Sequence, residues 1–133
     1  MPVQINTLQE GIGIEFISSG VVTGEEIIEA NKKIYTRKNL LRLKYKIIDR
    51  STCTDYRVTP GEIKTIAKQD IEASKINKNI VIVLVSPTAL QYGMTRMWQV
   101  HAEDLGFQSK IFKDRESANE YINEFFNKPN KAD

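Results

Sequence analysis

Several hydroxyl and acidic side chains stand at points where a strand of this sequence would end and a helix would begin. They are Thr23, Asp49, Ser51, Thr52, Thr59, Ser86 and Thr88. Ligands of open α/β sheets bind beyond the carboxyl ends of the strands, where hydroxyls and free helix amides can hold an anion. The same hydroxyls are preferred helix N-caps. The pattern therefore has two interpretations, an anion pocket at this rim or helix capping alone.

Two further polar side chains are candidates for the same pocket. Tyr92 and Arg96 are four residues apart and share one face of a predicted helix. Arg96 would clamp an anion in one interpretation, and would pair with a carboxylate such as Asp49 or Glu103 in the other. Asp49 is either a ligand-binding carboxylate or a turn former that bonds the amides of Ser51 and its neighbour.

Catalytic groups are sparse in this sequence. His101 is the single histidine and lies on the apolar side of a predicted helix, which favours a core imidazole and excludes a histidine-based metal cluster. Cys53 is the single cysteine and has no nucleophile context. No paired carboxylates or nucleophile–base pair can be assembled. We therefore expect no catalytic residue, no metal site and no cofactor, and an enzyme is the weakest function considered.

Composition bounds the remaining choices. A chain of 133 residues is one domain of common size, and its net charge of +2 gives no global electrostatic case for nucleic acid. The longest apolar run is too short to cross a bilayer, and no early segment resembles a signal peptide. A lone cysteine is typical of a reducing compartment. We expect a cytoplasmic protein without a membrane span.

One segment departs from the nearly balanced charge of the whole chain. Residues 32–46 contain seven lysines and arginines and no acid, with Tyr35 and Tyr45 interleaved. This segment could contact RNA, an acidic protein or a membrane surface, or it could be a solvated helix end and loop.

The elements that position these residues follow from periodicity and capping. We predict strands at 3–8, 12–17, 44–49, 80–85 and 110–112, with a polar loop at 50–55. We predict helices that begin at Thr23, Thr59, Ser86 and Asp114, the first of which ends near 37–39. The third carries one apolar face, consisting of Leu90, Met94, Met97, Trp98, His101 and Leu105. Trp98 is thus expected to be buried.

The stretch from Asn79 to Asp114 organises this arrangement. Its strand, Ile80 to Val85, is uninterrupted in its apolar character, which is typical of a parallel sheet covered on both faces. The first two strands are close enough for an antiparallel hairpin at the sheet edge. The fold class is therefore α/β, a single five-stranded and mostly parallel sheet with helices on both faces. We expect one domain at 1–127 and a polar tail at 128–133.

The order and spacing of several short motifs resemble the STAS-like domains, and more narrowly the small SpoIIAA-like proteins. These motifs are Ser19-Gly20-Val21-Val22-Thr23-Gly24-Glu25-Glu26, Ile48-Asp49-Arg50-Ser51, Thr59-x-x-Glu62-Ile63, Tyr92-Gly93-Met94-Thr95-Arg96-Met97 and Lys110-Ile111-Phe112. In the anti-sigma-factor antagonists of this fold, the first serine of an Asp-Ser-Ser-Gly run is phosphorylated. Thr59 falls at that position here, but Val58 replaces the aspartate and Pro60 replaces the second serine.

The resemblance implies a non-enzymatic regulatory or protein-interaction domain that binds an anion or small ligand at the rim. The alternative is a small-ligand or lipid carrier, since the related CRAL-TRIO fold has a similar order of strands and helices. A protein partner is expected, nucleic acid is not, and self-association is left open.

Overall fold

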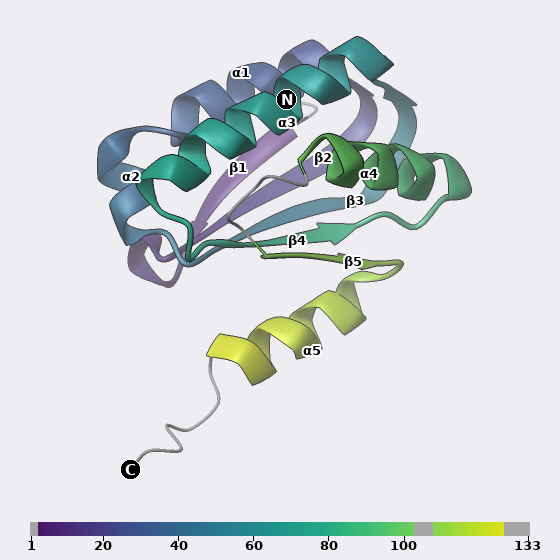
Figure 1. Ribbon diagram of the computed structural model, residues 1–133. Coiled ribbons are helices and arrows are strands. Elements are labelled where there is room, and N and C mark those ends of the chain that lie inside the picture. Colours follow the sequence, from purple (N-terminus) through teal and green to yellow (C-terminus); the bar gives the residue numbers. More distant parts are fainter. Residues whose placement is uncertain (1–2, 103–107, 127–133) are drawn as a thin grey trace.

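A single five-stranded sheet organises the chain (Figure 1). The structure is a computed structural model and describes residues 3–102 and 108–126. The sheet consists of β1 (Val3–Leu8), β2 (Gly13–Thr23), β3 (Tyr45–Arg57), β4 (Val81–Val85) and β5 (Gln108–Phe112), in that spatial order. β1 runs antiparallel to β2, and the other neighbours are parallel. The predicted fold class is confirmed, including the edge hairpin.

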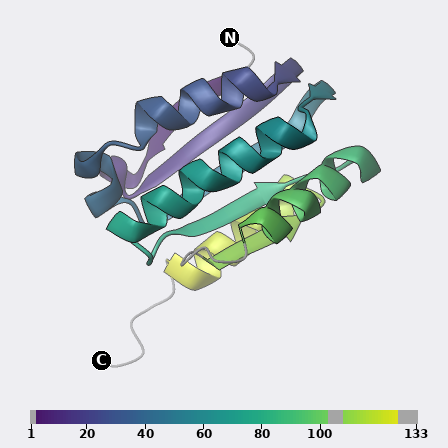
Figure 2. The same ribbon diagram turned by 45° about the horizontal axis from the view of Figure 1, so that its top comes forward.

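Helices cover the two faces unequally. One face carries α1 (Gly24–Ile34), α2 (Arg37–Arg42), α3 (Pro60–Ile76) and α4 (Ala89–His101), and the other carries α5 (Arg115–Phe126). Figure 2 shows α1, α3 and α4 side by side across their face. No helix in the described part of the chain is long and apolar enough to cross a lipid bilayer.

The core has two layers because β4 buries side chains on both faces. Ile82 and Leu84 pack beneath α1, α3 and α4, while Val81, Val83 and Val85 pack against α5. This explains the continuous apolar run at β4, because a strand with two covered faces has no polar side.

Capping fixes where most of the helices begin, as predicted. Thr23 and Thr59 both form complete capping boxes, with Glu26 and Glu62 respectively. Asp114 accepts a hydrogen bond of 2.7 Å from the amide of Ser117 in the first turn of α5. The third start was misplaced: Thr88 caps α4 by accepting from the Gln91 amide at 3.1 Å, and Ser86 does not cap it.

The predicted loop at 50–55 is wrong. β3 continues to Arg57, and β2 continues with it, because the two strands pair in parallel from Gly13↔Tyr45 to Thr23↔Arg57 through two register shifts. β4 reaches only Asp49 of β3. The extension is therefore a two-stranded ribbon whose polar side chains are largely exposed, which is why its sequence resembles a loop.

The first helix is also shorter than predicted. It ends at Ile34, and a separate helix, α2, follows at once. Thr36 starts that helix by accepting from the Asn39 amide at 3.2 Å. The sequence prediction did not recognise Thr36 as a helix cap, so it merged two helices into one.

The predicted apolar face of α4 is only partly correct. Trp98 is buried, with 5% of its surface exposed, but Leu90 is 61% exposed and His101 is also exposed. The buried side consists of Gln91, Thr95 and Trp98. The core imidazole expected at His101 is therefore wrong. Glu103, Leu105 and the tail at 128–133 lie outside the described residues.

Candidate functional site

Charged side chains of β3 point into both layers of the core. Lys46 and Arg50 alternate with Ile48 on the face below α1, α3 and α4, while Asp49 lies on the α5 face. Lys46 and Arg50 are 1% and 5% exposed. Lysine and arginine are rarely buried without partners, so the residues around these two side chains determine whether each charge is compensated.

Lys46 is held by a set of fixed acceptors. Its Nζ donates to Asn31 Oδ1 at 2.7 Å and to Tyr35 Oη at 2.9 Å, and lies 3.8 Å from Asp70 Oδ1. The ring faces of Phe16 and Tyr35 lie 4.7 Å from the same ammonium group. The ammonium is therefore completely enclosed, with its carboxylate partner at the long end of ion-pair distance.

Asp70 is the carboxylate partner of Lys46, and neutral donors hold it. Tyr35 Oη donates to one of its oxygens at 2.5 Å, and Trp98 Nε1 donates to the other at 2.8 Å. Asp70 is 1% exposed. The four side chains Lys46, Tyr35, Asp70 and Trp98 thus form one connected network between α1, α3, α4 and the sheet.

Burial controls the titration of this network. It lowers the pKa of Lys46 to about 8; the Asp70 carboxylate opposes this, and the Arg50 charge lowers the pKa further. Burial also raises the pKa of Tyr35, and the neighbouring Asp70 charge raises it again. Lys46 is therefore the group in this network closest to losing its proton near neutral pH.

Arg50 lacks an equivalent partner. Its Nη1 donates to the hydroxyl oxygens of Thr95 at 2.8 Å and Ser86 at 3.2 Å, and its guanidinium carbon lies 4.7 Å from the centre of the Tyr56 ring. Its Nε is buried and has no hydrogen-bond acceptor. Among the described residues, no carboxylate lies within ion-pair distance of Arg50.

A small cavity of about 20 Å³ lies between these groups. Most of its wall is apolar, and its lining includes Ile27, Ile48, Ile63, Ile66, Leu84, Met94 and Trp98. Its charged lining consists of Lys46, Arg50 and Asp70, which leaves one positive charge uncompensated. A cavity of this size holds roughly one water molecule.

α4 covers this cavity with few fully buried apolar side chains. Its buried side contains two polar residues and one tryptophan, and Gln91 Oε1 is buried there without a partner. By contrast, α3 buries Ile63, Ile66 and Ala67. Local opening is easiest where few apolar contacts are lost. Met94 and Met97 of α4 also pack half-buried on the core, but a shift of α4 uncovers fewer fully buried apolar side chains than a shift of α3.

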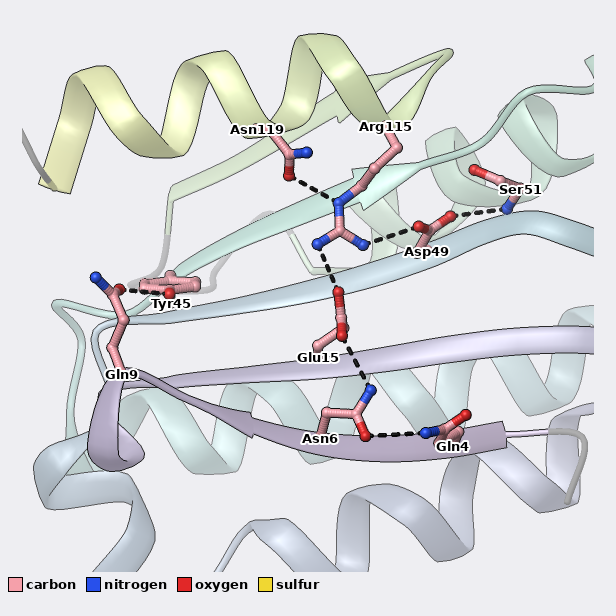
Figure 3. A network of polar contacts seen from close by, with 9 residues as sticks. All are labelled: Gln4, Asn6, Gln9, Glu15, Tyr45, Asp49, Ser51, Arg115 and Asn119. Atoms are coloured by element: carbon pink, nitrogen blue, oxygen red, sulfur yellow. Dashed lines mark hydrogen bonds and ion pairs between the residues drawn. The ribbon is translucent and has the colours of Figure 1, made fainter.

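The α5 face holds a separate polar network around Arg115 (Figure 3). The guanidinium contacts Glu15 at 2.5 Å and Asp49 at 2.9 Å, and Nε donates to Asn119 at 2.8 Å. Burial acts to raise the pKa of Asp49, but hydrogen bonds from Ser51 and Arg115 outweigh it and lower the pKa. This network joins the start of α5 to β2 and β3, with one guanidinium shared between two carboxylates.

The structure places the residues of the predicted rim in several different environments. Asp49 and Ser51 lie on the α5 face, where the Ser51 amide donates to Asp49 at 2.8 Å. Thr59 and Thr88 cap α3 and α4. Among the predicted site residues that the structure describes, Ser86 alone hydrogen-bonds to Arg50.

The two candidates on α4 face outward. Arg96 is exposed and donates to Gln99 at 2.8 Å, rather than to Asp49. Tyr92 is 38% exposed, and Lys113 Nζ lies 5.9 Å from its ring centre. Neither residue lines the internal cavity.

Sequence reasoning missed Lys46, Arg50, Asp70 and Arg115. A signal was present for the first two, because they alternate with Ile48 in a strand whose both faces are covered. Asp70 likewise continues the buried spacing of Ile63 and Ile66 along α3.

Comparison with known proteins supports the fold. No protein family and no curated protein matches the sequence. Among solved structures, the chain is similar to an uncharacterized protein of the DUF3478 family with a SpoIIAA-like fold, from Shewanella loihica. The TM-score is 0.51 and the identity 18%, over 90% of this chain and 91% of the other. At this identity the likeness shows the fold alone, and that fold is the SpoIIAA-like one which the sequence motifs indicated.

Proposed function

We propose that this SpoIIAA-like chain is a non-enzymatic binding domain that takes up a small organic anion beneath α4, with Arg50 as the anion-binding residue. The observation that carries this proposal is the state of Arg50. Its guanidinium is buried, its hydrogen-bond partners in the described structure are neutral hydroxyls, and its Nε has no acceptor.

The energetics favour an added anion. A buried charge without a counter-ion costs several kcal/mol. The Ser86 and Thr95 hydroxyls and the Tyr56 ring offset part of that cost, and Asp70 is already engaged by Tyr35 and Trp98. A ligand carboxylate would accept from the free Nε in a charge-assisted hydrogen bond, the stronger class of such bonds.

The cavity limits the size of the ligand. At about 20 Å³ it is far too small for a lipid chain, and a short carboxylate would enter only with a displacement of α4. The aliphatic wall and the flexible Met94 side chain suit a short apolar group attached to the carboxylate. We therefore propose short-chain carboxylates as the ligand class, in preference to lipids.

The single tryptophan provides the assay. Trp98 lines the cavity, so its fluorescence will report an occupant directly. We expect saturable changes with acetate, butyrate or hexanoate, and much weaker changes with the alcohols of matched length. Arg50→Met should weaken carboxylate binding about 10–100-fold, because hydrogen bonds to a charged group contribute about 1.5–3 kcal/mol.

Arg96→Met is the matched control, because Arg96 is an exposed arginine on α4 itself. It should bind carboxylates as the unmodified protein does. Equal binding by the Arg50→Met protein would refute the proposal. So would the absence of any carboxylate response, together with no bound ligand in native mass spectrometry.

A second candidate is a phosphorylation-regulated protein-interaction domain. It is supported by Thr59, which is exposed at the start of α3 and corresponds to the phosphorylated serine of the antagonists. The neighbouring Glu62 carboxylate, which accepts from the Thr59 amide at 2.9 Å, would repel a phosphate there. Intact-mass measurement of protein isolated with phosphatase inhibitors tests this candidate, with Thr59→Ala as the control.

A further inference from the structure

The end of the molecule opposite the Thr59 and Thr88 caps carries exposed cations around exposed apolar side chains. We call it the basic end and define it by Arg37, Lys38, Arg42 and Lys44, with Leu41 and Ile76. All six residues are exposed, Leu41 at 58% and Ile76 at 38%. Figures 1 and 2 both place α2 and the C-terminal end of α3 together at this end.

Hydrogen bonds fix the two helices against each other. The Asn77 side chain, just after α3, donates to the carbonyls of Leu40 at 2.7 Å and Leu43 at 3.1 Å. Arg42 donates to the Glu10 carbonyl at 2.5 Å. The exposed leucine and isoleucine are therefore held on a rigid surface, rather than on a loose loop.

Helix stability explains Arg42, which lies in the last turn of α2, but not Arg37 and Lys38. Cations stabilise the C-terminal end of a helix and are unfavourable at its start. Arg37 and Lys38 occupy the first turn of α2, which has no acidic residue. Two acids lie near this end: Glu10, and Glu72, which is paired with Lys75 at 2.6 Å. The surface therefore retains a positive excess.

We infer that the basic end docks on an anionic lipid bilayer. Cations attract the acidic headgroups, and each exposed aliphatic side chain enters the boundary of the acyl region. RNA would need the cations but would gain little from Leu41 and Ile76. An acidic protein partner would leave the chain unbound to protein-free vesicles, so vesicle binding distinguishes it from a bilayer. This inference rests on surface charge and exposure, and holds whether or not the cavity beneath α4 binds a ligand.

The test is vesicle co-sedimentation of the full chain. We expect binding to vesicles that contain phosphatidylserine, little binding to pure phosphatidylcholine, and loss of binding at high salt. Arg37→Glu with Lys38→Glu should reduce binding at least about tenfold, because each cation near such a surface contributes appreciably. Glutamate is favourable in the first turn of α2, so this variant should fold.

Two further variants separate the contributions. Leu41→Ser should weaken binding several-fold while the charges stay intact. Lys64→Glu with Lys113→Glu makes the same charge change at the opposite end and should bind as the unmodified protein does. Equal effects of the two charge reversals would overturn the inference, since they would indicate net charge alone. Failure to bind anionic vesicles would also overturn it, including any case in which RNA still binds.

Discussion

The buried Lys46 should make the protein more stable as the pH rises from 8 to 9. In the folded protein its pKa is lowered from 10.5 to about 8, because burial outweighs the attraction of Asp70 at 3.8 Å. The unfolded chain therefore binds more protons than the folded one between these two pKa values. Stability rises with pH wherever the unfolded state binds more protons.

The size of the effect follows from the two pKa values. Between pH 8 and pH 9 the free energy of unfolding should increase by about 1 kcal/mol through Lys46 alone. Above about pH 10 the trend should reverse. The folded-state pKa of Tyr35 is raised well above 10, so the folded protein then holds the extra proton and loses stability as the pH rises.

Urea denaturation followed by Trp98 fluorescence at pH 8, 8.5 and 9 measures this increase. Lys44→Met is the matched control, because Lys44 is exposed two residues earlier, and it should keep the increase. Lys46→Met should remove it; if that variant does not fold, titration of the Lys46 ammonium by NMR replaces it. A flat or falling free energy of unfolding between pH 8 and 9 in the unmodified protein would refute the reasoning, since it would show that burial does not lower the pKa of Lys46.

Three further substitutions test the surrounding structure by urea denaturation. Asp70→Asn should cost about 3–5 kcal/mol because it leaves Lys46 buried without a carboxylate partner. Arg50→Met should be neutral or stabilising because it removes a buried charge that has no carboxylate partner. An equal cost for both would contradict this difference. Thr59→Ala should cost about 0.5–2 kcal/mol through its lost cap, and an unchanged midpoint would show that the cap contributes nothing. Arg115→Met should cost about 1–2 kcal/mol, since its ion pairs join α5 to the sheet but are partly solvated. No loss of stability would show that apolar packing alone holds α5 on the sheet.

The sequence predicted the fold well where a single local rule decides the structure. The apolar run of β4 indicated a strand buried on both sides, and the boxes at Thr23 and Thr59 marked two helix starts correctly. The prediction failed where contacts between residues distant in sequence determine the structure. β3 extends to Arg57 only because β2 pairs with it along that whole length.

The candidate site shows the same division. The rim hydroxyls were identified from their caps, yet the layer to which each belongs depends on side-chain direction along β3. Asp49 and Arg50 are adjacent in sequence and lie on opposite faces of the sheet. The surroundings of Arg50 are set by its hydrogen bonds to Ser86 and Thr95, which are 36 and 45 residues away in the sequence. No local sequence pattern specifies those contacts.

The most direct test of the proposed function is to observe the free Nε–H of Arg50 by NMR. Comparison with the spectrum of Arg50→Met assigns its signal, and the exposed Arg96 provides an internal reference. On titration with butyrate, we expect a saturable shift of the Arg50 Nε–H signal and increased protection of that proton from exchange, while the Arg96 signal stays fixed. An Arg50 signal that does not move at saturating butyrate, or moves only in parallel with Arg96, would show that Arg50 does not bind the carboxylate.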